Sequence, residues 1–444
     1  MKREWLLAIG ITLLTLALSL GMIRWMAPTL LGVPMDMQLV QTDTRAIPFF
    51  DALLPAGPPP DNAFILPDPV TRVRNHPLLP EGETLGPHDL LGFRNQTIPR
   101  MADVIVIGDS QTYGNNAPLA RNWPSQMQEQ LSGRTATLYS MAVGGWCGVQ
   151  YLEMFRKALA FQPRVVVVAF YAGNDPLESF IMAYGQERYQ KLRPDPALSP
   201  KDAPKVAFPP PESEWEPFTF ADGSTTVLTP NWRLGSNSDL PAIRAGYAIL
   251  AKVARTIAQE ASVVGVKVIF ALIPTKERVF QQKIRRDGLK ASAVYQELVA
   301  REEEHATRFA ENLAAMPNAI WVDLLPPMSR AALDTALYPD GPDGHPLAAG
   351  YEQIAQAIAP KLRELLPAPT RGLVAVMTDQ KSFQVWLMTR TGRWLVPADP
   401  ERIAANGWSM ESLKEVPARD VASVPILGVM ERDPARFGPE AVTH

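Results

Sequence analysis

The sequence is poor in cysteine and has no strong excess of charge of either sign. Cys147 is the only cysteine among 444 residues, so no disulfide can form within the chain, and we expect a buried, unreactive thiol. The 43 Lys and Arg residues nearly balance the 46 Asp and Glu residues, which leaves a formal net charge of −3. The sequence has no basic stripe, no Cys/His spacing suited to zinc and no Gly-x-Gly-x-x-Gly turn after a strand. We therefore predict no nucleic-acid partner, no metal site and no cofactor.

The most prominent apolar run without a charge lies at the amino terminus, between Trp5 and Ile23. Lys2 and Arg3 precede the run, which is long enough to span a bilayer. We expect residues 1–27 to form an uncleaved signal anchor that crosses the cytoplasmic membrane once and leaves the rest of the chain on the periplasmic side. Cleavage beyond this segment is the alternative, and it leaves the chain on the same side.

Composition divides the rest of the chain into three parts. Residues 28–100 are rich in Pro, and we expect a stalk that then wraps the main domain, residues 101–367. Residues 371–444 are expected to form a small β-rich accessory module. Within the main domain, residues 176–240 are too long for an ordinary connection and form an insertion. The insertion either walls the functional site and selects the substrate, or it is only a surface excursion.

Strand-like and helix-like segments alternate from Asp103 onward, which predicts parallel strands joined by crossover helices. The predicted strands are residues 104–107, 135–141, 165–170, 266–272 and 319–322, and the predicted helices are residues 123–131, 149–160, 242–263, 291–315 and 346–366. A separate hairpin with Asp222-Gly223 as its turn is predicted inside the insertion. The predicted fold class is therefore α/β, with a parallel sheet between layers of helices.

Short polar and glycine-containing segments follow the predicted strands and precede the last helix. In chain order they are Gly108-Asp109-Ser110, Gly144-Gly145, Asn174-Asp175 and Asp343-Gly344-His345. Because the carboxyl ends of parallel strands meet at one edge of a sheet, we expect these segments to lie close together. Each segment alone also has a structural interpretation, since glycines permit a tight turn and Asn174 can cap the next helix. All four segments in this order favour a catalytic site.

A serine hydroxyl becomes a nucleophile at neutral pH only with a base within hydrogen-bond reach and donors for the developing oxyanion. Ser110 is the predicted nucleophile and His345 the predicted base. Asp343 is the carboxylate expected to orient the base and to stabilise its charged form. The expected oxyanion donors are the backbone N–H groups of Ser110 and Gly145 and the side-chain amide of Asn174.

Together, these segments resemble the blocks of the SGNH (GDSL-type) hydrolase superfamily across roughly residues 100–365. The resemblance implies a flavodoxin-like three-layer sandwich and assigns the chemistry to the same residues. It also implies ester chemistry through an acyl-Ser110 intermediate, on an O-acetylated carbohydrate of the cell envelope or an exopolysaccharide. If water resolves the intermediate, the protein is an esterase. If a sugar hydroxyl does so, the protein is an O-acetyltransferase, and a membrane-bound partner supplies the acyl group. The remaining alternative is a polysaccharide-binding or assembly subunit without catalysis.

The chain departs from the usual pattern of this superfamily at neighbouring positions. Ser140 and Ala142 stand where Asn and Gly are usual in the second block, and Ala172 stands where Gly usually opens the third. The commonest esterases place the acid three residues before the histidine, where this chain has a proline. The acid is therefore expected at Asp343, with Asp340 as the alternative. The two-residue spacing is similar to that of the periplasmic branch of alginate O-acetyltransferase-like proteins.

Four further side chains are predicted to contact the substrate. Tyr113 and Trp146 stand beside the serine and glycine segments, and Lys276 and Arg278 are candidates for binding an anionic sugar. The alternative for the last pair is that Thr275 only caps a helix there. The tail also carries three tryptophans that either stack on sugars or form its core, namely Trp386, Trp394 and Trp408.

Overall fold

The computed structural model describes most of the predicted main domain and parts of the tail. The described residues are 64–99, 101–131, 136–316, 318–366, 372–377, 383–388, 393–397, 403, 413–422 and 426–429. The predicted anchor, residues 1–27, lies outside them. Among the helices within these ranges, none is both long and apolar enough to cross a bilayer.

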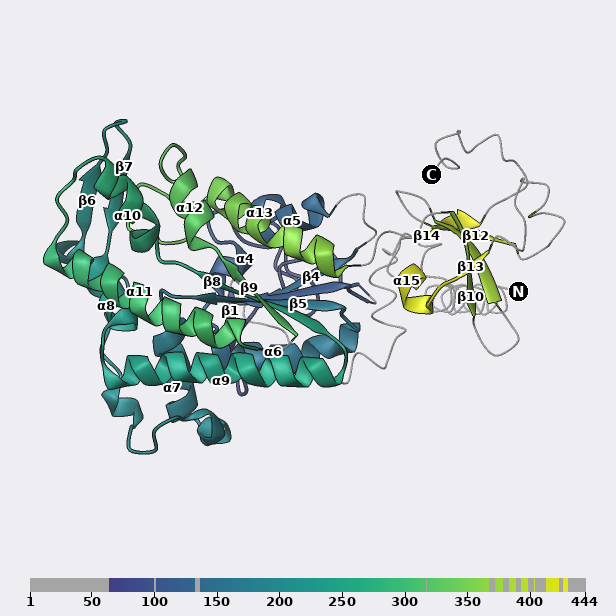
Figure 1. Ribbon diagram of the computed structural model, residues 1–444, viewed down its shortest axis with the longest axis horizontal. Coiled ribbons are helices and arrows are strands. Elements are labelled where there is room, and N and C mark those ends of the chain that lie inside the picture. Colours follow the sequence, from purple (N-terminus) through teal and green to yellow (C-terminus); the bar gives the residue numbers. More distant parts are fainter. Residues whose placement is uncertain are drawn as a thin grey trace, which may run out of the picture.

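Five parallel strands form the central sheet (Figure 1). In chain order they are β3 (Val104–Gly108), β4 (Leu138–Ala142), β5 (Val165–Tyr171), β8 (Lys267–Ile273) and β9 (Ala319–Asp323). Their order along the sheet is β4–β3–β5–β8–β9. From β3 the chain goes first to β4 at one edge, and it then continues on the other side of β3 with β5, β8 and β9. This is the flavodoxin-like order, in which ligands bind at the carboxyl ends of the strands where the direction of travel reverses. All five predicted strands are confirmed, with small differences at their ends.

Helices bury both faces of the sheet. Val104 and Val106 of β3 belong to one core, and Ile105 and Ile107 belong to the other, because successive side chains of a strand point to opposite sides. The first core is closed by α5 (Trp123–Gln130), α10 (Lys276–Arg286), α12 (Leu325–Ala331) and α13 (Ala348–Leu365). The second is closed by α6 (Gly148–Ala158), α7 (Asp175–Gly185) and α9 (Pro241–Val263), and α11 (Ala293–Ala314) contributes to both. The sheet thus lies between two helical layers, as predicted (Figure 1).

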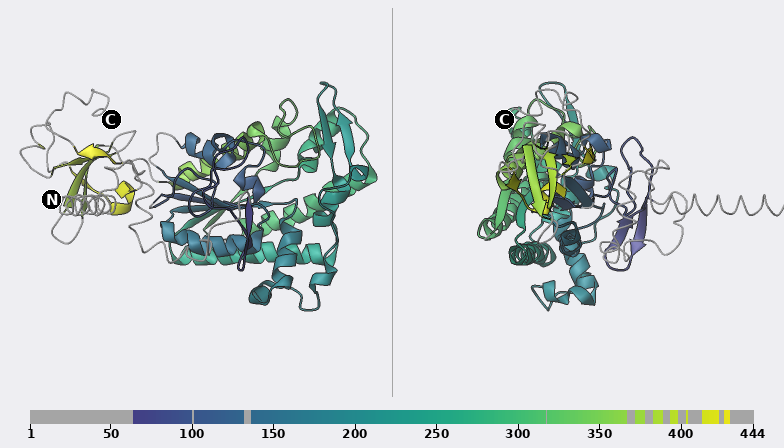
Figure 2. Two further views of the ribbon diagram at one scale, coloured as in Figure 1. Left: turned by 180° about the vertical axis from the view of Figure 1, so that it is seen from behind. Right: turned by 90° about the vertical axis from the view of Figure 1, so that its right-hand side faces the viewer.

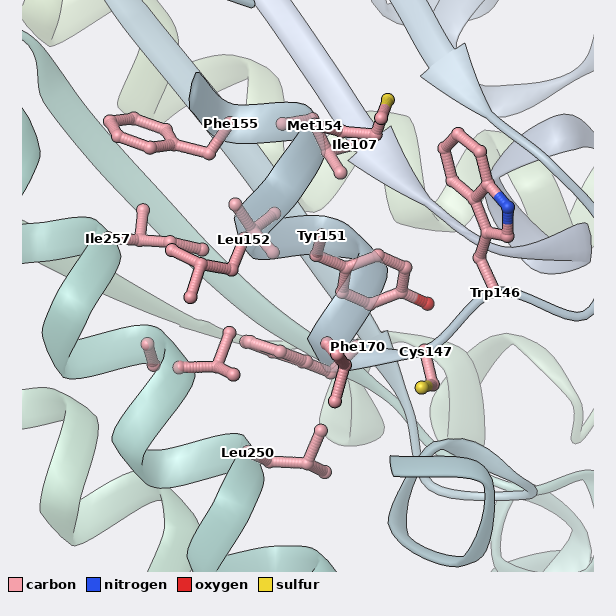
Figure 3. Packing of buried hydrophobic residues seen from close by; sticks show 14 of the residues in the cluster. Ile107, Trp146, Cys147, Tyr151, Leu152, Met154, Phe155, Phe170, Leu250 and Ile257 are labelled. Atoms are coloured by element: carbon pink, nitrogen blue, oxygen red, sulfur yellow. The ribbon is translucent and has the colours of Figure 1, made fainter. Parts of the chain in front are cut away.

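Figure 3 shows the packing of the second core. Tyr151 of α6 lies toward Phe170 of β5, and their ring centres are 5.7 Å apart. Leu250 of α9 comes so near to Gly148 that a Cβ atom on this glycine would lie 2.5 Å from it. The lack of a side chain at Gly148 therefore sets how closely α6 and α9 pack. Cys147, directly before this glycine, is buried, as predicted.

Residues 64–99, in the part of the chain predicted as a stalk, contain a hairpin that the sequence analysis did not predict. Its strands β1 (Ile65–Asp68) and β2 (Arg72–Asn75) pair antiparallel. The indole N–H of Trp146 donates a hydrogen bond to the backbone oxygen of Val73 at 2.7 Å. The hairpin is therefore held beside the segment that follows β4.

The insertion contains the predicted hairpin and a further helix. The elements are β6 (Glu216–Thr219), β7 (Thr225–Leu228) and α8 (Pro230–Asn237). Gly223 in the turn has φ +82°, in the left-handed region that favours glycine. Nζ of Lys283, on α10, lies 2.8 Å from the carboxylate of Asp222. The hairpin prediction is confirmed, and the hairpin is fastened to the main domain through α10.

The described part of the tail is a second five-stranded sheet. Its strands are β10 (Gly372–Met377), β11 (Phe383–Met388), β12 (Arg393–Val396), β13 (Lys414–Glu415) and β14 (Ile426–Val429). Strands β11 and β12 pair antiparallel, and the β-rich character predicted for this part of the chain is confirmed for its described residues. Trp386 is buried and Trp394 is half-buried in its apolar clusters, which fits the core interpretation, while Trp408 lies outside the described residues. Figures 1 and 2 place this module at the end of the domain away from β6 and β7, and Arg164, before β5, contacts Asp420 of α15 (Ala418–Ala422).

Candidate active site

Ser110 is the first residue of α4 (Ser110–Tyr113), a short helix that begins directly after β3. Asp109 caps this helix, because its buried carboxylate accepts a hydrogen bond from a backbone N–H of the first turn at 2.9 Å. A Cβ atom on Gly108 would lie 2.0 Å from the hydroxyl of Thr112, so only glycine allows the chain to turn so tightly here. Ser110 consequently stands at the carboxyl edge of the sheet, where the strand order reverses.

A chain of hydrogen bonds joins Ser110, His345 and Asp343. Nε2 of His345 lies 2.8 Å from Oγ of Ser110, and Nδ1 lies 2.7 Å from Oδ1 of Asp343. Because a carboxylate only accepts hydrogen bonds, Nδ1 carries the proton, and Nε2 of the neutral ring accepts from the serine hydroxyl. Asp340, the alternative acid, makes no hydrogen bond to His345 within the described structure, whereas Asp343 also accepts from the His345 N–H at 2.9 Å. The geometry thus pairs the histidine with Asp343.

Asp343 is held in its charged form by its hydrogen-bond donors. Burial acts to raise the pKa of Asp343, but hydrogen bonds from His345 and Asn116 outweigh burial and hold this pKa well below its usual range. The amide nitrogen of Asn116 lies 2.8 Å from Oδ2 of Asp343 and 3.2 Å from the backbone oxygen of His345. The sequence analysis missed Asn116, because a single asparagine in a loop carries no recognisable pattern.

The loop that carries Asn116 is fastened by Arg94, which the sequence analysis also missed. Arg94 is buried, and its guanidinium donates hydrogen bonds of 2.8 to 3.2 Å to backbone oxygens. The accepting residues are Gly86, Tyr113, Gly114 and Ala117. Arg94 therefore ties residues 64–99 to the loop that follows Ser110.

The loop that carries the base is bound by Lys276. Its Nζ lies 2.8 Å from the backbone oxygen of Pro339 and 2.6 Å from that of Gly341. Burial lowers the pKa of Lys276 to about 8. The N–H of Val227, in β7, donates to the backbone oxygen of Asp340 at 2.8 Å. In contrast to the predicted substrate contact, the structure places the Lys276 ammonium on this loop and not among the residues that line the cavity.

The three residues predicted to bind an oxyanion all line one cavity beside the serine hydroxyl. They are Ser110, Gly145 and Asn174. Gly145 has φ +80°, which lets the chain turn sharply after β4. The N–H groups of Ser110 and Gly145 donate to no acceptor in the described part of the chain. Asn174 precedes α7, but its side chain makes no capping hydrogen bond, so the capping interpretation is wrong and the amide remains available to a ligand.

The structure does not bring the other predicted contacts to the cavity. The hydroxyl of Tyr113 is buried and lies 2.8 Å from Nε2 of His88. Trp146 is buried against the β1–β2 hairpin, and Arg278 is buried in α10. None of these three predicted residues lines the cavity. Their side chains point into the core or into structural contacts, which their position next to a motif does not reveal.

The cavity has a volume of about 660 Å³ and is walled by three parts of the chain. The segments around the serine, histidine and aspartate form one part of the wall. Ile65 and Leu85 form a second part, and Phe208, Trp232 and Arg233 of the insertion form a third. The insertion therefore lines the site, and its interpretation as only a surface excursion does not hold.

The fold and the site define a class of protein. A parallel α/β sheet with a hydrogen-bonded serine, histidine and aspartate at the carboxyl edge of its strands is the arrangement of an α/β serine hydrolase. The chain belongs to the GDSL-like lipase/acylhydrolase family, whose model matches residues 106–353. The matched range contains Ser110, Gly145, Asn174, Asp343 and His345.

Several solved structures are similar to part of this chain. A GDSL-like lipase from Bacteroides thetaiotaomicron VPI-5482 is 14% identical, with 59% of this chain and 88% of that chain covered and a TM-score of 0.30. TesA is 15% identical, with 59% and 99% covered and a TM-score of 0.32. A mutant of Axe2, an acetylxylan esterase from Geobacillus stearothermophilus, is 14% identical, with 60% and 95% covered and a TM-score of 0.32. No curated protein matches the chain, so the family assignment rests on the family model.

Proposed function

We propose that this member of the family hydrolyses esters through an acyl-Ser110 intermediate and acts on O-acetylated carbohydrate of the cell envelope or an exopolysaccharide. The observation that carries the proposal is the chain of hydrogen bonds of 2.8 and 2.7 Å from Ser110 through His345 to Asp343. A sugar substrate is supported by Phe208 and Trp232, which line the cavity with their rings 6.2 Å apart. Phe208 is 85% exposed, so its ring is available to pack against the apolar face of a ligand.

In the first half-reaction, Nε2 of His345 takes the proton of the Ser110 hydroxyl while Oγ attacks the ester carbonyl carbon. The carbonyl oxygen becomes an oxyanion, which accepts hydrogen bonds from the N–H groups of Ser110 and Gly145 and from the Asn174 amide. Asp343 stabilises the imidazolium. The imidazolium then gives its proton to the departing alkoxide, and the acyl group remains on Ser110.

In the second half-reaction, a hydroxyl group attacks the acyl carbon and gives its proton to His345, which returns it to Ser110. Water in this role makes the protein an esterase, whereas a sugar hydroxyl makes it an O-acetyltransferase. The insertion lines the cavity through Phe208 and Trp232. If the insertion excluded water once a substrate is bound, it would favour the second candidate, because the acyl intermediate would then be protected from hydrolysis. A membrane-bound partner would then supply the acyl group.

We also propose that residues 1–27 hold the protein to the cytoplasmic membrane with the catalytic domain on the periplasmic side, as in the alginate O-acetyltransferase-like branch of the family. The support is the uncharged run after Lys2 and Arg3 and the two-residue spacing of Asp343 and His345. Membrane fractionation, followed by protease treatment of intact spheroplasts, tests the proposal. A chain found in the soluble fraction, or a domain digested only after lysis, contradicts it.

The decisive experiment compares the full-length protein with its Ser110→Ala variant on 4-nitrophenyl acetate, with and without oligosaccharide acceptors. We expect acetate release to be lost in the variant, together with labelling by a serine-reactive fluorophosphonate. Acetyl transferred to an acceptor assigns the transferase. Equal turnover by both proteins, with no labelling, assigns the chain to the polysaccharide-binding alternative.

A further inference from the structure

The guanidinium of Arg233 is a buried cation that donates no hydrogen bond within the described part of the chain. It lies in α8, lines the cavity and is 6% exposed. Its Nε is buried without an acceptor, and the nearest carboxylate oxygen, Oε2 of Glu277, lies 3.7 Å away, too far for a hydrogen bond. A buried guanidinium without acceptors is unfavourable, because several N–H groups have lost their water. Glu277 forms an ion pair with Arg233 and balances its charge, but the guanidinium still has no hydrogen-bond acceptor among the described residues, which a ligand in the cavity can supply.

Tyr171, the last residue of β5, places a second unpaired donor beside Arg233. Its hydroxyl is buried without a hydrogen-bond partner, and the residue lines the cavity. The guanidinium carbon of Arg233 lies 5.6 Å from the centre of the Tyr171 ring. Burial raises the pKa of Tyr171, so the hydroxyl keeps its proton and can donate it to an acceptor. Gly173 leaves room for this ring, because a Cβ atom at that position would lie 2.3 Å from ring carbon Cζ.

Both donors face the loop that carries the base. A Cβ atom on Gly344 would lie 2.2 Å from Nη2 of Arg233 and 3.3 Å from the hydroxyl of Tyr171. Gly344 directly precedes His345, whose Nε2 contacts the serine hydroxyl. A substrate group bound by the two donors therefore lies close to the reacting ester.

The charges around Arg233 give no excess of positive charge. The neighbouring cations are Lys276 and Arg278, and the carboxylates that act on Arg233 and Lys276 are Glu277, Glu302, Asp340 and Asp343. The class of ligand is therefore indicated by the donors of Arg233 and Tyr171 that have no acceptor within the described structure, and not by the net charge of the wall.

We propose that Arg233 and Tyr171 form a carboxylate-binding subsite, and that the preferred substrate is an ester with a carboxylate near the ester group. A carboxylate offers acceptors both to the planar guanidinium and to the phenol hydroxyl. The carboxylate stands either on the alcohol side, as in an acetylated uronic acid, or on the acyl side, as in a hemisuccinate. This inference rests on the proposed function, because it names the substrate class of the same site.

The test measures kcat/KM of the full-length protein on pairs of esters that differ only in charge. One pair is an O-acetylated oligouronate and its methyl ester, and the other is a sugar hemisuccinate and its methyl ester. We expect the charged member of one pair to be preferred by at least about tenfold, the usual effect of one hydrogen bond to a charged group. The pair that shows the preference identifies the side that carries the carboxylate. Equal kcat/KM within both pairs overturns the inference.

Variants assign the preference to its residues, and the readout is the ratio of kcat/KM within a pair. Arg233→Met is expected to bring the ratio to about one, and Tyr171→Phe to lower it severalfold, as expected for loss of one donor. Arg278→Met is the matched control, because it removes a buried arginine of the same region that does not line the cavity. Its ratio should stay at the wild-type value. An unchanged ratio in Arg233→Met overturns the inference, and so does a ratio lost equally in Arg278→Met.

Calorimetry with the full-length Ser110→Ala protein separates this inference from the proposed function. The ligands are an unacetylated oligouronate and monomethyl succinate, each compared with its fully methyl-esterified form. Tighter binding of one charged ligand, lost on the additional change Arg233→Met, supports the subsite even if the wild type shows no serine-dependent turnover. Turnover without any charge-dependent binding supports the proposed function and overturns the subsite.

Discussion

Asn174 is the residue that contributes its side chain to the candidate oxyanion site. This side chain does not cap α7, because it makes no hydrogen bond to the first turn of the helix. Asn174→Ala should therefore lower kcat by about 10² to 10³, the usual effect of removing one oxyanion donor. The melting temperature should change little, because no cap is lost. Turnover of 4-nitrophenyl acetate and a thermal melt measure the two effects. A lower melting temperature with an unchanged kcat would assign Asn174 to the fold instead.

Asn116 supports the acid of the site from outside the catalytic chain of hydrogen bonds. Its amide lies 2.8 Å from Asp343, whose side chain is 44% exposed, so water partly replaces a lost bond. We expect Asn116→Ala to lower kcat about fivefold, equivalent to about 1 kcal/mol of barrier. Asn312→Ala, an asparagine on the exposed face of α11, is the control and should behave as the wild type. A kcat equal to that of the control would show that Asp343 needs no support from Asn116.

At the scale of elements, the loop that carries the base depends on α10 and β7. Lys276 on α10 binds two backbone oxygens of this loop, and β7 binds a third. Lys276→Met should lower kcat by about tenfold or more, because losing a charged donor to buried oxygens shifts the histidine. The melting temperature should also fall by several degrees, as expected for a loss of about 1 to 3 kcal/mol. Kinetics and thermal melts of the purified variant measure both effects.

A surface lysine on another helix provides the control for this prediction. Within the described part of the chain, the Lys361 ammonium on α13 pairs with the exposed carboxylate of Glu364 alone, so Lys361→Met should change neither quantity measurably. If Lys276→Met lowers the melting temperature but keeps the wild-type kcat, the lysine stabilises the fold without positioning the base.

At the scale of the whole molecule, a buried carboxyl group couples stability to pH. Burial raises the pKa of Asp89 to about 7, against the opposing effect of hydrogen bonds from Tyr139 and Asn95. The ordinary value is 3.8, so the folded protein binds this proton more tightly than the unfolded chain does. The contribution of Asp89 to the free energy of unfolding is therefore fully present below about pH 4 and is lost as the pH rises through about 7.

Asp89→Asn should remove this pH dependence. We expect the melting temperature of the wild type, minus that of the variant, to fall as the pH rises from about 4 to about 7. The difference is the proper readout, because groups with a lowered pKa, such as Asp343, act with the opposite sign at acidic pH. Asp195→Asn, at an exposed position, should show a constant difference. A constant difference for Asp89→Asn would contradict the prediction.

The parts of the molecule that follow local patterns were predictable from the sequence. Continuous β-branched runs such as 165–168 predict strands buried on both faces, and the structure confirms them. The Asp222-Gly223 turn predicts its hairpin because glycine readily adopts the positive φ found there. The hairpin in residues 64–99 was missed, because its short strands are embedded in a segment rich in proline, where no alternating pattern stands out.

The candidate site also contains residues that the sequence predicted and residues that only the structure placed. Ser110 was identified because it directly follows a predicted strand, and His345 because it directly precedes the predicted helix of residues 346–366. Lys276 and Arg278 were expected at the ligand, yet the structure buries both away from the cavity and places Arg233 there. A long cationic side chain leaves the same local pattern whether it ends on a loop, in the core or in a cavity, so only its neighbours in space decide its role.

By itself, the sequence determined the α/β class, the parallel strands and the set of motif residues that meet at one edge of the sheet, because strand periodicity and the order of elements are local properties. Only the tertiary structure decided that Asp343 and not Asp340 contacts the base, that the insertion lines the cavity, and that Arg233 stands in its wall. These features depend on loops and side chains brought together from distant parts of the chain, and their positions follow from packing and not from spacing along the sequence.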